Sequence, residues 1–344
     1  MKRGYIPMGI RDIAKDAGVS VATVSRVLNG TKFVSKELQE KVLASIERQG
    51  YVADHIARSM VLKKTFTIGL IIPSVSEMYH QMIFTSVEST LEAAGYKVLV
   101  CRVQDTLSNE RIYLDLLMQN RVDGIILMHE SNNPEVYAQL KKTQVPIVLA
   151  GIDIPGLQFP QVRIDDLAAA MDGTGYLLRL GHRKIGLITG SGYSVGDKRL
   201  EGYKKSLAEY GVSFDESLLE AGGYTIESGY EAMKTLLARH SHLDAVFALS
   251  DEMAVGALRA AFEQRRSIPQ EISLLGFDGI TLSAYTTPKL TTVSQPISEI
   301  GQKSAVILMK MLRSKDPVPK LTLIPHSLQE GHSCVAHTDL HTNY

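Results

Sequence analysis

Several segments of the 344-residue chain bring together residue types that enzymes use. The run GSGYSVG, from Gly190 to Gly196, follows a strand pattern as a nucleotide loop would, but it lacks the GxGxxG spacing and the Lys-Ser/Thr of a P-loop. Scattered serine, histidine and aspartate residues are not expected to form a nucleophile elbow or a metal pair. Cys101 and Cys334 are isolated, so neither a disulfide nor a zinc site is indicated. These residues favour a protein that is not an enzyme and needs no cofactor.

The first 50 residues carry the pattern of three short helices. Apolar residues recur at helical spacing from Ile10, and Gly18 is suited to ending that helix. Ser20 is placed to cap a second helix over residues 21–28, and Ser35 to cap a third. Three helices with a tight, glycine-containing turn between the first two form a helix-turn-helix unit, which predicts a small DNA-binding domain.

The start of the second helix would face base edges, because that helix enters the major groove with its N-terminal residues first. Val21 and Ala22 stand there, and Arg26 follows about one turn later. Arginine can donate two hydrogen bonds to guanine, and small apolar side chains can contact a thymine methyl group. The alternative is that the three residues are ordinary helix surface, with Arg26 in a salt bridge.

Charge is distributed unevenly, although the formal net charge is zero. Residues 1–64 contain 12 lysines and arginines against 6 aspartates and glutamates, and the remaining residues contain 25 against 31. A basic segment suits a polyanion, since each phosphate that it neutralises releases counterions. The two parts of the chain are therefore expected to bind different partners.

From residue 65 the pattern changes to strand-length apolar runs that alternate with amphipathic stretches, which predicts parallel sheets covered on both faces. The runs are TFTIGLIIP, YKVLVCRV, VDGIILM, PIVLAGI, KIGLITG, AVFALS, ISLLGFD and LTTVSQP. The openings Thr67–Ser74 and Lys184–Ser191 are alike and indicate two similar α/β lobes. Ligands bind at the carboxyl ends of such strands, so a small-molecule cleft between the lobes is expected.

The segment DIAKDAGVSVATVSRVLNG, from Asp12 to Gly30, resembles the DNA-binding signature of LacI/GalR-type repressors. YVADHIARSM at 51–60 resembles that family's hinge, and LGHRKIGLITG, RLEGY, ESGYEAM, SDEMAVGALRA, GFDGI and PKLTTVSQP recur in the family's order. The resemblance covers residues 9 to 330. It implies a homodimeric repressor with a small all-α helix-turn-helix domain and an α/β two-lobed sensor like the periplasmic sugar-binding proteins.

The resemblance also implies how the chain divides. The helix-turn-helix domain would take residues 1–50, and the hinge helix and linker residues 51–65. The sensor N-lobe would take 66–164 and 295–325, and the C-lobe 165–294 and 326–344. The tail after residue 330 shows no leucine heptads, so a dimer without a tetramerising coiled coil is predicted.

The DNA contacts implied by the resemblance fall into three sets. Val21, Ala22 and Arg26 would read bases, and short hydroxyl and amide side chains would contact phosphates, namely Ser20, Thr23, Ser25 and Asn29. Met60 matches the apolar hinge residue that enters the minor groove, where leucine is usual, and Ala57 belongs to the same stretch. The alternative for Met60 is packing against its dimer mate. Asp54 replaces the usual Asn or Ser and would place a negative charge near phosphate.

The cleft candidates are Tyr79, Arg199, Tyr224, Ser250, Asp278 and Gln295. A polyhydroxylated ligand needs paired donors and acceptors and an apolar face for its C–H surface, which Arg199, Asp278 and Tyr224 could provide. Structural ion pairs and ordinary packing are the alternatives. Ser250 stands where sugar-binding members often have Asn, and Gly151 where some have an acidic residue, so the identity of the ligand stays open.

Three functions fit these patterns: an inducible repressor of a sugar-use operon, a regulator that needs a corepressor such as a purine or a phosphorylated protein, and a sugar-binding module without DNA binding. The helix-turn-helix argues against the last, and no residue gives the sign of the ligand's effect. No apolar run approaches the ~20 residues of a membrane helix, and the N-terminus lacks an apolar signal region. A cytoplasmic location is therefore expected.

Overall fold

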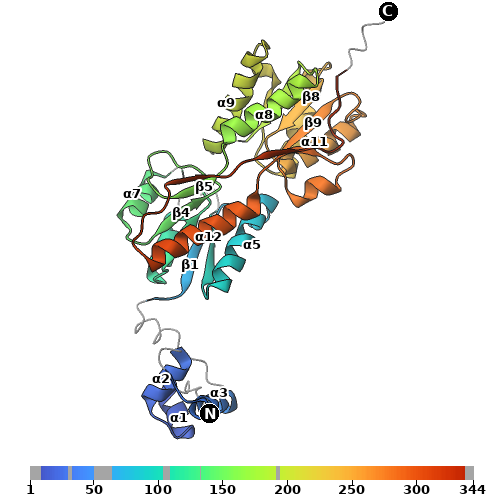
Figure 1. The fold of residues 1–344 in the computed structure, drawn as a ribbon. Coiled ribbons are helices and arrows are strands. Elements are labelled where there is room, and N and C mark those ends of the chain that lie inside the picture. Colours follow the sequence, from blue (N-terminus) through green and yellow to red (C-terminus); the bar gives the residue numbers. More distant parts are fainter. Residues whose placement is uncertain are drawn as a thin grey trace, which may run out of the picture. The chain divides into compact units, whose positions relative to one another are not determined.

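The computed structural model describes residues 9–29, 33–49, 64–103, 109–131, 133–190 and 194–337 (Figure 1). The chain divides into two compact units, Met1–Thr65 and Phe66–Tyr344. None of the helices in the described ranges is both long and apolar enough to cross a membrane.

The first unit contains the three predicted helices, α1 (Ile10–Asp16), α2 (Val21–Asn29) and α3 (Lys36–Gln49). Gly18 makes the turn between the first two with a φ of 65°, in the left-handed region that favours glycine. Asp16 joins the first helix to the third, since its Oδ2 accepts hydrogen bonds from Ser45 Oγ at 2.6 Å and Arg48 Nη2 at 2.7 Å. The buried core of the unit consists of Ile13, Ala14, Val24 and Val42.

The first sheet of the second unit is wholly parallel, with strand order β11-β5-β4-β3-β1-β2. Its strands are β1 (Thr67–Ile72), β2 (Lys97–Arg102), β3 (Gly124–Leu127), β4 (Ile147–Ala150), β5 (Gln161–Arg163) and β11 (Leu321–Leu323). Leu70 of β1 belongs to one core cluster and Ile71 to another. This alternation means that both faces of the sheet are covered. The covering helices are α5 (Met78–Ala93), α12 (Ile297–Arg313), α6 (Asn109–Gln119) and α7 (Pro134–Lys142).

The second sheet has strand order β12-β10-β9-β8-β6-β7. Its strands are β6 (Ile185–Thr189), β7 (Leu219–Ala221), β8 (Ala245–Ala248), β9 (Ser273–Asp278), β10 (Thr291–Ser294) and β12 (Ser327–Gln329). Its helices are α8 (Asp166–Arg179), α9 (Ser194–Glu209), α10 (Ile226–Arg239) and α11 (Asp251–Glu263), and two 3-10 turns span Glu216–Leu218 and Thr281–Tyr285. α8 packs beside α9, and α10 beside α11.

In the described part of the chain, the prediction of parallel strands is wrong at β12, which pairs antiparallel with β10. β12 is the next strand after β11. β11 runs parallel to β5, so it ends at the carboxyl ends of the strands of the first sheet, which face the other lobe. The chain therefore enters the second sheet from the carboxyl ends of its strands and runs against them.

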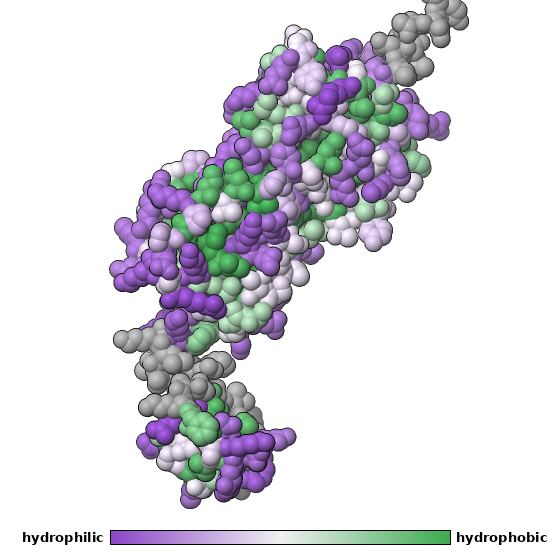
Figure 2. All heavy atoms as spheres, in the orientation of Figure 1, coloured by the Kyte–Doolittle hydropathy of each residue, from purple (hydrophilic) through white to green (hydrophobic). Residues whose placement is uncertain are grey.

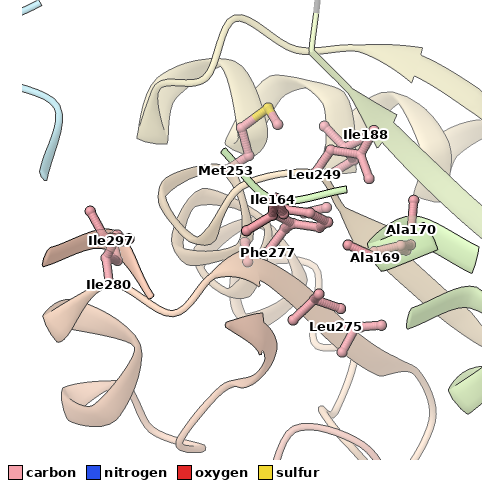
Figure 3. Close-up of a cluster of buried hydrophobic side chains, with 14 of the residues drawn as sticks. Ile164, Ala169, Ala170, Ile188, Leu249, Met253, Leu275, Phe277, Ile280 and Ile297 are labelled. Carbon is pink, nitrogen blue, oxygen red and sulfur yellow. The ribbon is translucent and has the colours of Figure 1, made fainter. Parts of the chain in front are cut away.

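The chain passes between the two sheets at three places in the described part: after β5, after β10 and after β11. Each crossing carries a buried isoleucine, Ile164, Ile297 and Ile324, and all three belong to one core cluster. Figure 3 shows Ile164 against Phe277 of β9, and Ile297 beside Ile280. The apolar core thus runs through the crossings and connects the two lobes. We call the lobe built on the first sheet the N-lobe and the other the C-lobe.

Candidate nucleic-acid interface and ligand cleft

The α2 helix presents one apolar face to the core and another face to solvent. Val24 is fully buried, whereas Val21 is 42% exposed and the side chains of Ala22 and Arg26 are also exposed. Exposure of the first turn and of Arg26 is what a helix that enters a DNA groove requires. The geometry is therefore compatible with the predicted base contacts.

Some of the residues predicted to contact DNA phosphates also stabilise the start of α2. Ser20 caps α2, since its Oγ accepts a hydrogen bond from the Thr23 backbone N–H at 3.1 Å and lies 2.9 Å from Thr23 Oγ1. Ser25 is partly exposed on the same helix. Of the remaining predicted contacts, the Asn29 side chain, Ala57 and Met60 lie outside the described residues, as does Asp54. For Ser20 and Thr23, a structural function in starting the helix accompanies the predicted one.

A cavity of about 700 Å³ lies between the two lobes of the second unit. It is lined at the carboxyl ends of strands from both sheets, as the topology of parallel α/β lobes predicts. Five of the six predicted cleft residues line it: Tyr79, Arg199, Tyr224, Ser250 and Asp278. Gln295 is buried at the crossing after β10 and donates a hydrogen bond from Nε2 to Asp278 Oδ1 at 2.8 Å, so it positions Asp278.

Arg199 is the buried centre of the cleft floor. Its Nε donates to Asp166 Oδ1 at 2.9 Å, and its Nη1 donates to the Leu249 carbonyl at 2.8 Å. Nη1 also lies 3.6 Å from Asp278 Oδ1, and the guanidinium stacks 3.7 Å from the centre of the Phe277 ring. The arginine is thus fixed by protein groups before any ligand enters, and it is both an ion-pair partner and a lining residue.

Asp278 has an unusual backbone conformation and a carboxyl group with a raised pKa. Its φ is 108°, in the left-handed region, at the end of β9. Burial raises the pKa of its carboxyl to about 7, against the opposing effects of Arg199 and of the hydrogen bond from Gln295. Near neutral pH this carboxyl can therefore offer a ligand either a donor or an acceptor.

The two tyrosines explain two glycines on the cleft wall. A Cβ on Gly151 would lie 2.5 Å from Tyr79 Oη, so no side chain fits there while the tyrosine holds its place. A Cβ on Gly190 would lie 1.9 Å from the Tyr224 ring. Burial raises the pKa of both phenols, for Tyr224 to about 12, so both hydroxyls stay protonated at neutral pH. The absence of an acidic residue at position 151 thus follows from the position of Tyr79.

Ser250 follows β8 and caps α11, because its Oγ accepts a hydrogen bond from the Met253 N–H at 3.2 Å. Its hydroxyl therefore has a structural acceptor function beside its place on the cleft wall.

Charged residues missed by the sequence interpretation make up much of the remaining lining. They are Glu77, His80, Arg102, Glu110, His129, Glu130 and Glu252. His129 and Glu130 follow the strand GIIL after one intervening residue, Met128, so the rule of strand carboxyl ends could have found them. Glu252 sits beside Ser250 in the motif SDEM, but only the fold shows that it reaches the other lobe.

Four contacts among the described residues join the lobes across the cleft. Glu252 Oε1 accepts from the Met78 N–H at 2.7 Å, and Glu130 Oε2 accepts from the Ser194 N–H at 2.7 Å. Lys198 pairs with Asp153, and Ser194 Oγ donates to the Asp153 carbonyl at 2.7 Å. These contacts hold the lobes in one relative position.

The sequence GYSVG at 192–196 has the GxSxG spacing of a nucleophile elbow, contrary to the expectation that no such motif occurs. Its serine is Ser194, the first residue of α9. The Ser194 hydroxyl donates to a carbonyl across the cleft, and in the described part of the chain no histidine is hydrogen-bonded to it. A structural function in lobe contact therefore accounts for this serine.

One group of potential metal ligands lies outside the cleft. Ligand atoms of His182, Asp244 and His337 all lie within 4.8 Å of one another. His182 is buried and its Nε2 is 3.0 Å from the Val335 carbonyl, while the His337 N–H donates to the Leu180 carbonyl at 2.7 Å. The group fastens the C-terminal segment to the C-lobe.

Comparison with known proteins identifies the family. A family model described as bacterial regulatory proteins, lacI family, matches residues 9–54, and one described as a periplasmic binding protein-like domain matches residues 174–334. Catabolite control protein A of Priestia megaterium is 34% identical over 322 residues, which are 93% of this chain and 97% of that relative. The chain belongs to the lacI family of bacterial regulatory proteins.

Solved structures of lacI-family proteins share this fold. The lac repressor dimer bound to operator and the anti-inducer ONPF matches with a TM-score of 0.87 at 26% identity, over 96% of this chain and 100% of that one. A complex of the transcriptional regulator CelR with cellobiose matches with a TM-score of 0.73 at 29% identity, over 95% and 99%. The predicted fold class and family are confirmed, and the relatives are regulators rather than enzymes.

Proposed function

We propose that this lacI-family protein is a transcriptional repressor that binds a pseudo-palindromic operator, with an affinity set by a small sugar-like effector in the cleft. The observation that carries the proposal is the pairing, in one chain, of an exposed lacI-type recognition helix with a cavity lined from two lobes. If effector and operator each favour one of two conformations of the protein, each must change the binding affinity of the other by the same factor.

In this proposal α2 supplies the sequence readout. Val21, Ala22 and Arg26 contact bases, and Ser20, Thr23, Ser25 and Asn29 contact phosphates. Ala57 and Met60 act from the hinge, where Met60 wedges into the minor groove. Support for the α2 part comes from the exposure of its first turn and of Arg26.

The effector would be bound by Tyr79, Arg199, Tyr224, Ser250 and Asp278, with Gln295 positioning Asp278. The stacked guanidinium, the two phenol groups and the carboxyl supply fixed donors, an acceptor and aromatic faces, which suit a polyhydroxylated molecule. A cavity of about 700 Å³ has room for a mono- or disaccharide.

The protein would act as a cytoplasmic homodimer, since two recognition helices match the two halves of a palindrome. The N-lobe offers an apolar surface for such an interface. Val306 on α12 and Leu321 and Leu323 on β11 are 49%, 43% and 47% exposed. Figure 2 shows apolar side chains on the face of the N-lobe turned to the viewer. The lobe division predicted from the sequence, 66–164 with 295–325 and 165–294 with 326–344, is retained in this proposal.

The test is binding of the full-length protein to a fluorescent DNA fragment from upstream of its own gene, measured by anisotropy with and without a panel of sugars. Specific binding that one sugar weakens is the expected result and defines an inducer. Tightening by a ligand would instead indicate a corepressor. Absence of any preference over unrelated DNA would contradict the repressor function.

A further inference from the structure

Helix N-termini are common binding places for phosphate and other anions, because free backbone N–H groups and the positive end of the helix dipole lie there. Two 16-residue helices, α5 and α9, begin at the cleft, at Met78 and Ser194. Both of these starting N–H groups already donate, at 2.7 Å, to a glutamate of the opposite lobe, Glu252 and Glu130 respectively. The protein's own carboxylates therefore occupy the positions that a ligand phosphate would need.

At two further helices that begin near the cleft, side chains of the protein also bind N-terminal N–H groups. α11 is capped by the Ser250 hydroxyl and carries Asp251 and Glu252 in its first turn. α10 is capped by Thr225, whose side chain accepts from the Ser228 N–H, while Ser228 Oγ lies 3.2 Å from the Thr225 N–H. Neither helix offers an anion an uncontested set of N–H groups.

Acidic side chains outnumber arginines in the lining of the cavity. Among the described residues around the cavity, the carboxylates are Glu77, Glu110, Glu130, Glu252 and Asp278, and the guanidinium groups are Arg102 and Arg199. The two lining histidines each face one of these carboxylates: His80 lies 3.1 Å from Glu77 and His129 lies 2.7 Å from Glu110. Asp278 is partly protonated near neutral pH, and the other four carboxylates still outnumber the two guanidinium groups.

Neither guanidinium changes this balance. Arg199 is already paired with Asp166 at 2.9 Å and remains so if Asp278 is protonated. Arg102 is exposed at the end of β2, where water screens its charge. An anion brought into the buried part of the cleft would thus lose its hydration without gaining an unpaired cation.

We propose that the effector carries no phosphate or carboxylate group and is a neutral or ammonium-bearing polyhydroxylated molecule. The inference rests on the proposed function of the cleft as the effector site. The contacts between the lobes strengthen this discrimination against anions. Glu130 and Glu252 each accept a hydrogen bond from the opposite lobe, and their negative charges repel an anion bound nearby. Sugar phosphates, nucleotides and organic acids are thereby rejected, and amino sugars are accepted.

The test is isothermal titration calorimetry of the full-length protein with matched sets: glucose, glucosamine and glucose 6-phosphate, ribose and ribose 5-phosphate, and cellobiose. We expect at least one uncharged or amino sugar to bind, and its phosphate ester to bind at least about 100-fold more weakly. A phosphate ester that binds as tightly as its parent would overturn the proposal. Binding of none of the uncharged or amino sugars would also overturn it.

A pair of variants tests whether the weaker binding of phosphate esters is caused by the cleft carboxylates. Glu252→Gln keeps an oxygen acceptor for the Met78 N–H but removes the charge, so the penalty against the phosphate ester should shrink by about tenfold. Glu263→Gln, at an exposed position on the same helix, should leave the penalty unchanged. An equal penalty in wild type and Glu252→Gln would contradict the role given to this carboxylate. Loss of specific operator binding, measured separately by anisotropy, would count against the proposed function rather than against the effector class.

Discussion

At the scale of single residues, the sequence predicted best the features that depend on neighbours in the chain. Arg26 and Val21 are exposed because Val24 occupies the buried face of the same helix, which periodicity alone predicts. Arg199 and Asp278 were identified through motifs, but the stacking of Arg199 on Phe277 and its pairing with Asp166 depend on residues far away in the sequence. Glu130 and Glu252 were missed because their partners lie on the other lobe.

Replacing Arg26 with alanine tests the recognition helix. We expect Arg26→Ala to weaken specific operator binding by about 5- to 150-fold, the worth of a paired hydrogen bond to guanine, and to affect non-specific DNA much less. Lys41→Ala is the matched control, because Lys41 is an exposed cation on α3 that pairs with Glu37. Anisotropy with operator and scrambled fragments measures both. Equal losses in the two variants would indicate that Arg26 contributes only charge.

The raised pKa of Asp278 predicts a pH-dependent contribution to folding. Its pKa is about 7 in the folded protein and near 3.8 when unperturbed, so between these values the folded state holds a proton that the unfolded state has lost. Its contribution to stability is therefore full below about pH 4 and is lost as the pH rises through 7, by up to about 1.4 kcal/mol per pH unit.

Asp278→Asn should flatten the fall in unfolding free energy between pH 5 and pH 8. Some slope should remain, because burial also raises the pKa of Asp251 and Glu252. Urea unfolding at four pH values measures the slope, and Asp316→Asn, on an exposed loop, is the control. A variant slope identical to that of wild type would show that Asp278 does not titrate in this range.

At the scale of elements, strand-length apolar runs predicted eight strands of the two sheets, β1 to β4, β6 and β8 to β10, because most of these strands are buried. The three-residue strands β5, β7, β11 and β12 gave no such signal, since each is short and only partly buried. Helix contacts that depend on glycine were also not predicted. α10 and α11 approach so closely that a Cβ on Gly256 would lie 1.9 Å from the Ile226 carbonyl oxygen.

Gly256→Ala should therefore destabilise the C-lobe by about 1–3 kcal/mol or more, because the obstructing atoms belong to the backbone and cannot rotate away. Gly223→Ala serves as a control, since its Cβ would meet only the Ser228 side chain at 3.6 Å. Urea unfolding followed by circular dichroism compares the two. Similar midpoints for Gly256→Ala and wild type would contradict the close approach of these helices.

At the scale of the whole molecule, the function depends on two units with different tasks, which the uneven charge distribution predicted. The basic first unit carries the recognition helix, and the second unit contains a cleft whose lobes share one core through three crossings. Cross-lobe contacts such as Glu252 with Met78 would have to break before the lobes could separate. Sequence patterns predicted this architecture but not the contacts, which depend on how the lobes face each other.

The coupling of cleft and operator is tested most directly by measuring effector affinity for the free protein and for the operator-bound protein. Linkage requires that the factor by which effector changes operator affinity equals the factor by which operator changes effector affinity, typically about 5- to 150-fold. Calorimetry with and without saturating operator gives the second factor, and anisotropy gives the first. We predict equal factors that differ clearly from one. An effector affinity that operator leaves unchanged would contradict the account of this protein as an effector-controlled repressor.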